Sequence, residues 1–313
     1  MNRVLITGAS GFVGACLTES LVQEGQEVAI VTRNIDNAWR LRKVINNVKI
    51  YNLDLCDEDS VKNMINDYKP DKIFNLATYG GYYFQNDTKK ILENNIMGTV
   101  NLVNACLKLD FKSFINIGSS SEYGTKIDSM TENDILEPIN VYGVSKAAAT
   151  LYCRMIAENE KLPIASVRLF SPYGYYEDKS RLVSSSILSC IRNENPKLAS
   201  REAVRDFIFI EDALDMMKKV SESENIYGKI YNCGTGKQHS IGDIVETIIN
   251  ISQKNLIPHW GKVEGRKSDT AKWEADMTLV KKELGWSPKF SLEQGIKKSY
   301  EWYKENIGLY TEE

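Results

Sequence analysis

A tyrosine and a lysine four residues apart, Tyr142 and Lys146, form the pair in this sequence best suited to proton transfer. Four residues is about one helical turn, so both side chains would lie on the same face of a helix. A free tyrosine has a pKa of about 10, and an adjacent positive charge favours its phenolate. The pair can therefore donate or accept a proton near neutral pH.

The surrounding elements separate this pair from three other tyrosines that precede a lysine by four residues. Tyr142 opens a predicted helix, residues 141–160, which follows a short apolar strand at 113–117. The end of that strand carries the run Gly118-Ser119-Ser120-Ser121-Glu122. A serine hydroxyl there could hydrogen-bond the substrate oxygen that the tyrosine protonates. A strand end, a serine and a Tyr/Lys helix together predict carbonyl or alcohol chemistry.

A second chemical feature lies near the start of the chain, where residues 7–14 read Thr-Gly-Ala-Ser-Gly-Phe-Val-Gly. An apolar strand-like run precedes this turn and an amphipathic stretch follows it. A strand, a glycine turn and a helix direct free N–H groups and the helix dipole to one place, where a pyrophosphate can bind. We expect Gly8 to allow the tight turn, Gly11 the approach of a phosphate, and Gly14 the close packing of helix on strand.

Composition excludes several other classes of protein. The 313 residues carry a net charge of -3 with both signs interspersed, which argues against nucleic-acid binding. No apolar stretch approaches the roughly 20 residues of a membrane span, and the absence of a leader pattern predicts a cytoplasmic protein. The six cysteines have no metal-site spacing, so we expect no metal. His239 and His259 stand in no motif, so another residue type should transfer the proton.

Strand-like and helix-like segments alternate through the first half of the chain. This pattern predicts an α/β fold, with a doubly wound parallel sheet covered by helices on both faces. Helix-like segments include 38–45 and 88–109. We expect a first domain at 1–172, to which 206–233 returns, and a smaller C-terminal α/β lobe at 173–313. Loops at the carboxyl ends of the strands should share one cleft.

With these motifs in place, nearly the whole chain resembles the extended short-chain dehydrogenase/reductases, and among them the NAD(P)-dependent sugar-nucleotide epimerase/dehydratase family. The resemblance implies a Rossmann-type domain that binds NAD(P) and a lobe that binds a nucleotide-diphosphate sugar. Ser119, Tyr142 and Lys146 match the family's catalytic set. Ser119 is the better match because it lies four residues before Tyr123, and Ser120 is the alternative.

The resemblance also implies a set of cofactor contacts. They come from the glycine turn and from segments that follow the strands: Gly8, Gly11, Phe12, Val13, Gly14, Asp54, Leu55, Leu76, Ala77, Thr78, Asn95, Lys146 and Phe170. Chains that prefer NAD usually end the second strand with an acid that binds the ribose 2′-OH. Here Thr32 and Arg33 stand at that place and suit a 2′-phosphate. NADP(H) is therefore favoured, while the nearby Asp36 leaves NAD(H) open.

On the substrate side the resemblance implies contacts from Tyr79, Ser119, Ser171, Arg181, Arg205 and Arg266. Arg205 and Arg266 would grip the diphosphate, since the forked guanidinium matches phosphate geometry; Arg181 would join them. Ser171 stands where many members carry an asparagine. The serine-rich loop lacks the Thr-Asp-Glu set with which related 4,6-dehydratases eliminate water, and Glu122 is misplaced to supply it.

The favoured function is an NADP(H)-dependent reductase that delivers hydride to C4 of a 4-keto-6-deoxy nucleotide sugar. The alternative is a nucleotide-sugar 4-epimerase that holds NAD tightly; a 4,6-dehydratase or an inactive dinucleotide sensor is less favoured. The resemblance further implies a homodimer in which helices 88–109 and 141–160 pair with their copies. The apolar positions of these helices could instead be core of one chain: Ile91, Met97, Leu102, Ala148, Leu151 and Met155.

Overall fold

A seven-stranded parallel sheet forms the centre of the protein in the computed structural model, which describes residues 2–263 and 270–310. The strand order is β3-β2-β1-β4-β5-β6-β9. These strands are β1 (Arg3–Thr7), β2 (Glu27–Thr32), β3 (Val48–Asn52), β4 (Lys72–Asn75), β5 (Ser113–Ser119), β6 (Ile164–Leu169) and β9 (Ile230–Cys233). The order reverses between β1 and β4, where ligands usually bind in such sheets.

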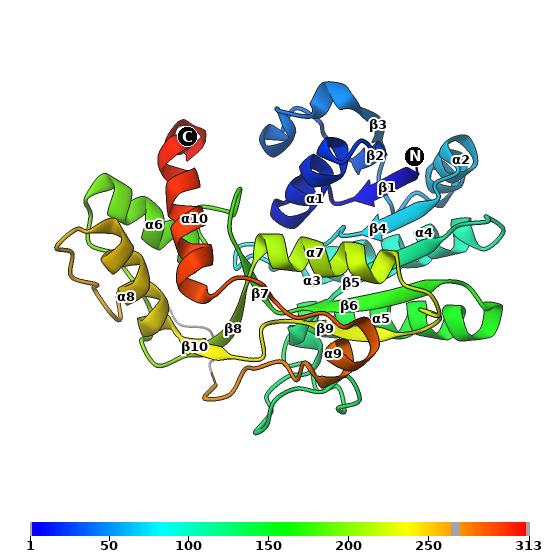
Figure 1. Cartoon of the computed structure of the whole chain (residues 1–313). Helices are drawn as coiled ribbons and strands as arrows, with labels where there is room; N and C mark the ends of the chain where they lie inside the picture. The colour runs from blue at the N-terminus through cyan, green and yellow to red at the C-terminus, as the bar shows by residue number, and fades with distance from the viewer. Residues whose placement is uncertain (1, 264–269, 311–313) are drawn as a thin grey trace.

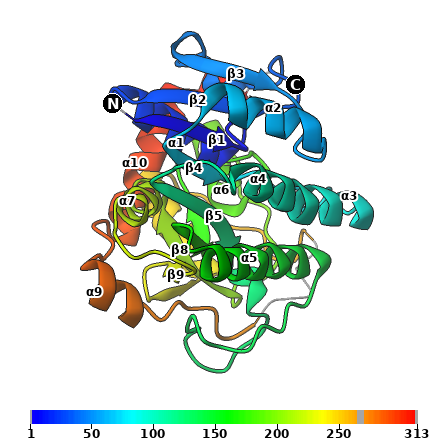
Figure 2. The same cartoon turned by 90° about the vertical axis from the view of Figure 1, so that its right-hand side faces the viewer.

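Helices cover both faces of this sheet, as Figures 1 and 2 show. One face carries α1 (Phe12–Gln23) and α7 (Ile210–Ser221), and the other carries α2 (Glu58–Tyr68), α4 (Gly98–Cys106) and α5 (Val141–Glu160). Side chains alternate along β1, with Val4 and Ile6 in one core cluster and Leu5 in the other. Burial on both faces explains why the strand sequences are apolar throughout.

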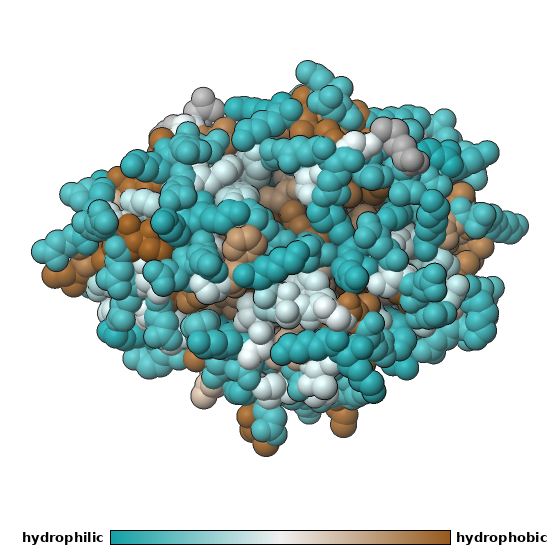
Figure 3. Space-filling view, in the orientation of Figure 1, coloured by the Kyte–Doolittle hydropathy of each residue, from teal (hydrophilic) through white to brown (hydrophobic). Residues whose placement is uncertain are grey.

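A second sheet of three strands lies beside the first and carries its own helices. It consists of β7 (Ser171–Tyr173), β8 (Val204–Phe209) and β10 (Gln238–Ser240), in the order β10-β8-β7. Helices α6 (Leu182–Arg192), α8 (Ile241–Ser252) and α10 (Leu292–Glu305) pack around it, and α9 (Thr278–Leu284) lies against β9. The face seen in Figure 3 is mainly hydrophilic with scattered apolar groups, so the large apolar side chains lie mostly inside.

Three predicted segments differ in the structure. Residues 38–45 form two 3₁₀ turns, Trp39–Leu41 and Ile45–Asn47, because the Val-Ile-Asn-Asn run at 44–47 favours helix poorly. The segment 88–109 is divided into α3 (Thr88–Leu92), a π-helical turn (Glu93–Met97) and α4. Residues 206–209 belong to β8 in the small sheet, and only α7 and β9 return to the large one. The division of the chain at residue 172 stays a prediction.

None of the helices within residues 2–263 and 270–310 is both long and apolar enough to cross a membrane.

A buried ion pair lies in the core next to the end of β5. Arg168 of β6 donates through Nε to Glu122 Oε2 at 2.8 Å, and the two side chains are 2% and 0% exposed. Glu122 Oε1 accepts from the Ser119 backbone N–H at 2.8 Å and from Thr150 Oγ1 of α5 at 3.0 Å. A Cβ at Gly118 would collide with this carboxylate, so glycine is required there. The pair therefore joins β5, β6 and α5.

We expect Arg168→Met to lower the free energy of unfolding by about 3–5 kcal/mol, because Glu122 would stay buried without its counter-ion. Denaturant unfolding of both proteins measures this difference. Arg154→Met is the matched control, since the Arg154–Glu158 pair on α5 is half exposed. It should cost no more than about 0.5 kcal/mol. Equal losses for the two variants would contradict the role given to the buried pair.

Candidate active site

The glycine turn after β1 has the backbone geometry that an anion site needs. Gly8 has φ +67°, and a Cβ there would lie 2.6 Å from the carbonyl of Leu76. A Cβ at Gly14 would collide with the carbonyl oxygen of Gly8. Only glycine fits either position, because the first needs a left-handed conformation and the second a close packing of α1 on β1.

The start of α1 is open to a ligand. Its N-cap residue, Gly11, offers no side chain to the first N–H groups of the helix, whereas Asn140 caps α5 by accepting from Gly143 N at 2.8 Å. A Cβ at Gly11 would approach only the carbonyl oxygen of Gly8, at 3.2 Å. Unsatisfied N–H groups and the positive end of the helix dipole therefore fit a pyrophosphate group of a dinucleotide.

Buried polar residues fix the neighbouring strand ends. Thr7 Oγ1 donates to Asn75 Oδ1 at 2.7 Å and accepts from the Ala77 backbone N–H at 3.1 Å. Asn75 Nδ2 donates to Thr99 Oγ1 at 3.0 Å and to Asn116 Oδ1 at 3.2 Å. These bonds hold the segment 76–78, which contains three of the expected cofactor contacts, against the glycine turn.

Asn95, in the π-helical turn, links the segment after β4 to the helix of the Tyr/Lys pair. Its Oδ1 accepts from the Tyr79 backbone N–H at 2.7 Å and from Thr78 Oγ1 at 3.4 Å. Its Nδ2 donates to the Tyr79 carbonyl and to Ser145 Oγ, both at 2.8 Å. Ser145 Oγ in turn donates to the Tyr142 carbonyl at 2.8 Å. A π turn is rare and often lies at functional sites, but nothing in the local spacing predicted this one.

The structure brings the proposed catalytic side chains together at the start of α5. The side chains of Ser119 and Thr78 lie near Tyr142, since both act on its pKa. Burial raises the pKa of Tyr142, while the bond to Ser119, the charge of Arg181 and the bond to Thr78 oppose that shift. Lys146 is 4% exposed, and burial lowers its pKa. Burial thus favours the neutral phenol, which is the form of Tyr142 that donates a proton.

The two candidate serines have different partners. Ser119 lowers the pKa of Tyr142, and its Oγ accepts from the Ser121 backbone N–H at 3.1 Å. Ser120 Oγ accepts from Trp273 Nε1 at 3.1 Å. The geometry therefore favours Ser119 over Ser120 as the residue beside the reacting oxygen. Trp273 had no signal in the sequence, since no motif marks it.

The residues expected around the adenine ribose lie at the ends of β2 and β3. The Thr32 hydroxyl donates to the carbonyl of Asn34 at 3.2 Å and accepts from its N–H at 3.3 Å, so it shapes the turn. Arg33 is exposed, and its Nη1 donates to Asn94 Oδ1 at 3.0 Å. Asp54 is exposed and accepts from the Cys56 N–H at 2.9 Å. Arg33 is therefore exposed where the sequence predicts a contact with a 2′-phosphate.

Other expected contacts are distributed between core and surface. Phe12, Leu55, Leu76 and Phe170 are buried, and Val13, Ala77, Tyr79 and Ser171 are partly exposed. Arg205 is 9% exposed on β8, with its guanidinium 5.0 Å from the centroid of the Trp273 ring. Arg266 lies outside the described residues. Among the residues the structure describes, no group of histidine, cysteine and acidic side chains could hold a metal ion.

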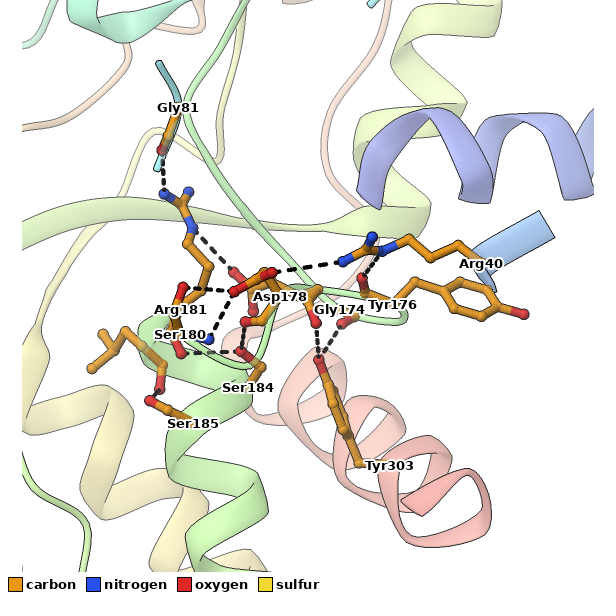
Figure 4. A network of polar contacts seen from close by, with 12 residues as sticks. Arg40, Gly81, Gly174, Tyr176, Asp178, Ser180, Arg181, Ser184, Ser185 and Tyr303 are labelled. Carbon is orange, nitrogen blue, oxygen red and sulfur yellow. Dashed lines mark hydrogen bonds and ion pairs between the residues drawn. The ribbon is translucent and has the colours of Figure 1, made fainter. Parts of the chain in front are cut away.

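Arg181 extends from the start of α6 toward the segment after β4, as Figure 4 shows. Its Nη1 donates to the Gly81 carbonyl at 3.3 Å, and its Nε lies 3.7 Å from Glu177 Oε1. Arg40 fixes the same loop from the cofactor side, because its Nε donates to the Tyr176 carbonyl at 2.7 Å. The sequence assigned Arg181 to the diphosphate. In the structure, the positive charge of Arg181 also lowers the pKa of Tyr142.

Comparisons with known proteins agree with this geometry. Residues 4–234 match the model of the NAD dependent epimerase/dehydratase family. The chain is 25% identical to a dTDP-glucose 4,6-dehydratase of Haemophilus influenzae, over 97% of this chain and 98% of the relative. It is 27% identical to a UDP-glucuronate 4-epimerase of Thermodesulfobacterium geofontis, over 99% and 98% of the two chains.

Solved structures show the same fold. UDP-glucose 4-epimerase of Thermotoga maritima matches with a TM-score of 0.88 at 24% identity, over 97% of this chain and 99% of the other. UDP-glucuronic acid 4-epimerase from Bacillus cereus, solved with UDP-glucuronic acid and NAD, matches with a TM-score of 0.87 at 25% identity, over the same shares. The chain belongs to the NAD-dependent epimerase/dehydratase family. The predicted family, the predicted fold and the prediction of an enzyme are thereby confirmed.

We expect Tyr142→Phe to lower kcat at least tenfold and to leave dinucleotide binding within about twofold, because the change removes only the hydroxyl that is predicted to transfer the proton. Steady-state kinetics and calorimetric titration measure the two quantities. Tyr300→Phe is the matched control, since Tyr300 and Lys304 have the same spacing on α10. If Tyr142→Phe kept more than about a tenth of the wild-type kcat, the assignment would be wrong.

Glu177 generates a pH-dependent prediction. Burial raises its pKa from 4.5 to about 8, and its Oε2 has no hydrogen-bond partner. The folded protein therefore keeps a proton that the unfolded chain releases, so the wild-type free energy of unfolding should fall as the pH rises from 4.5 to 8. The slope can reach about 1.4 kcal/mol per pH unit. We expect Glu177→Gln, which cannot titrate, to lose less stability than the wild type in this range.

Thermal unfolding of the wild type and Glu177→Gln between pH 5 and pH 9 measures the effect. Glu158→Gln is the control, because the Glu158 side chain is 51% exposed. Wild-type and Glu177→Gln curves that stay parallel across the range would contradict the prediction.

Proposed function

We propose that the protein is a cytoplasmic NADP(H)-dependent reductase that delivers hydride to C4 of a 4-keto-6-deoxy nucleotide sugar. The observation that carries this proposal is that Ser119, at the end of β5, acts on the pKa of Tyr142, which lies one helical turn before the buried Lys146. This is an arrangement for protonating an oxygen on a carbon that gains hydride. Curated relatives named as dehydratases and epimerases of nucleotide-linked sugars support the substrate class.

The bound dinucleotide would supply the hydride. The glycine turn and the uncapped start of α1 would hold its pyrophosphate, and Lys146 would hold the nicotinamide ribose. Ser119 donates a hydrogen bond to the carbonyl oxygen of the sugar, and Tyr142 gives that oxygen a proton as its charge develops. Arg205, Arg181 and Arg266 grip the diphosphate of the substrate. Each of these roles is a proposal that rests on the family resemblance and on the positions of the described residues.

The surroundings of Glu122 argue against elimination of water. Dehydration at C5 and C6 needs an acid and a base near the sugar. The loop offers Ser120 and Ser121 in the positions between Ser119 and Glu122, and neither is an acid. Glu122 itself is 0% exposed, and both of its oxygens accept hydrogen bonds from the protein. Its carboxylate is therefore committed to the core and is not available as the acid or base of an elimination.

A nucleotide-sugar 4-epimerase is the second candidate. The structural likeness to UDP-glucuronic acid 4-epimerase, solved with NAD, favours it. An epimerase would use the same residues to oxidise C4 and then reduce it from the other face. Arg33 favours the reductase, because a guanidinium beside the end of β2 suits the 2′-phosphate of NADPH. The complete Ser119, Tyr142 and Lys146 set argues against an inactive dinucleotide sensor.

We expect one NADPH to be oxidised for each 4-keto-6-deoxy nucleotide sugar converted, as measured by the absorbance of reduced nicotinamide.

Arg33→Ala should weaken NADPH binding about tenfold and change NADH binding less than twofold. Lys89→Ala, a change at an exposed cation near the same edge, is the control for lost surface charge. Equal losses of affinity for both cofactors would remove the case for NADP(H). Interconversion of two 4-hydroxy sugars with no net NADPH change would favour the epimerase.

We also propose a homodimer through α5 and the helical segment that runs from α3 to α4. Met97, Leu151 and Met155 are 48%, 52% and 43% exposed, so they form an apolar surface on these helices. Ile91 and Leu102 are 5% and 0% exposed, so these two positions are core of the single chain, as the alternative interpretation had it. Light scattering at micromolar concentration should give twice the chain mass. A monomer there, or a Leu151→Asp variant that remains dimeric, would contradict the proposal.

A further inference from the structure

Trp273 connects two parts of the proposed site that belong to different sheets. Its Nε1 donates to Ser120 Oγ at 3.1 Å, next to Ser119 at the end of β5. The face of the same indole lies 5.0 Å from the guanidinium carbon of Arg205 on β8. Trp273 is 5% exposed, so water has little access to either contact. One side chain therefore touches both the catalytic loop and the expected diphosphate-binding arginine.

The backbone around Trp273 is fixed on two sides. Toward the small sheet, the Trp273 N–H donates to Gln238 Oε1 at 2.8 Å, and the Ala275 N–H donates to Asp206 Oδ2 at 3.1 Å. Toward the large sheet, Asn232 Nδ2 of β9 donates to the Asp276 carbonyl at 3.2 Å, and the Met130 N–H donates to the Glu274 carbonyl at 2.8 Å. The segment 273–276 thus bridges the two sheets, and the Trp273 indole has little freedom to move away from Ser120.

This arrangement suits a role for Trp273 in holding its neighbours in place, and not a role in proton transfer. An indole N–H cannot accept a proton, and its acceptor is Ser120, not the hydroxyl that meets Tyr142. Ser120 lies between Ser119 and Ser121, however, and Ser119 Oγ accepts from the Ser121 N–H at 3.1 Å, so a displacement of the Ser120 backbone would move that donor. A bond that holds Ser120 therefore also holds the Ser119 hydroxyl in place.

We propose that Trp273 is a positioning residue that couples the diphosphate-binding Arg205 to the catalytic Ser119 through Ser120. This inference rests on the proposed function for the identity of the ligand. Occupation of the arginine by a diphosphate would fix the indole, the indole would fix Ser120, and the Ser119 hydroxyl would be aligned with the Tyr142 phenol. The substrate's nucleotide end would then order the site at which its sugar reacts.

The two contacts of Trp273 can be removed separately. Trp273→Phe loses the N–H donor and keeps an aromatic face, whereas Ser120→Ala loses the acceptor. Each single variant should lower kcat about five- to tenfold, and the double variant should be no worse than either, because both remove the same bond. Binding of UDP or dTDP, measured calorimetrically, should change less than twofold in all three. Trp273→Leu, which also loses the aromatic face, should weaken that binding as well.

Trp286→Phe is the matched control, because Trp286 Nε1 donates to Asp215 Oδ2 at 2.7 Å on the far side of α7. It removes the same type of bond and should leave kcat unchanged. Effects of Trp273→Phe and Ser120→Ala that multiply in the double variant, or a Trp273→Phe kcat within twofold of wild type, would overturn the coupling.

Hydrogen exchange separates this inference from the proposed function. UDP or dTDP should slow amide exchange at residues 119–123 in the wild type, and Trp273→Phe should bind the same nucleotide without that protection. This readout needs no turnover. If the wild type converts no nucleotide sugar but shows the protection, the proposed function fails and the coupling stands. If neither nucleotide binds, or if Trp273→Phe keeps the protection, the coupling fails.

Discussion

The bond between Glu122 and Arg168 is the interaction on which the proposed active site depends. Neither side chain reaches solvent, and the carboxylate also binds the Ser119 N–H and the Thr150 hydroxyl. Arg168 continues the network, because its Nη1 donates to the Tyr123 hydroxyl at 3.0 Å. That hydroxyl donates to Asn232 Oδ1 of β9 at 2.6 Å. One buried charge pair therefore sets the relative positions of β5, β6, β9 and α5.

The Glu122–Arg168 pair explains why Ser119 and Tyr142 lie near each other with little conformational freedom. Glu122 holds Ser119 through the Ser119 backbone N–H, and it holds α5 at Thr150, one turn beyond Lys146. Asn95 performs the corresponding task on the other side, where it joins the segment after β4 to Ser145. The proposed catalytic groups lie between two polar frameworks, both largely buried and both made of groups that satisfy one another.

The sequence predicted the elements whose signal is local and periodic. The helix expected at residues 141–160 has the bounds of α5, and the alternation of strands and helices predicted the parallel sheet. Glu122 was recognised only as misplaced for dehydration, because its partner Arg168 lies 46 residues away in the chain. Trp273 was missed for the same reason, since it meets Ser120 across 153 residues. The π turn was missed because the run Glu93–Met97 carries no local signal that separates it from an ordinary helical turn. Long-range pairs of polar residues leave no spacing that a single sequence can reveal.

Transfer of a labelled hydride tests the central claim most directly. The protein would be given NADPH that carries deuterium at C4 of the nicotinamide, together with a 4-keto-6-deoxy nucleotide sugar, and the product would be analysed by mass spectrometry and NMR. The account predicts one deuterium at C4 of the sugar from one face of the nicotinamide, with one NADP+ formed for each product. A sugar product that forms without deuterium, while the labelled NADPH remains unchanged, would contradict it.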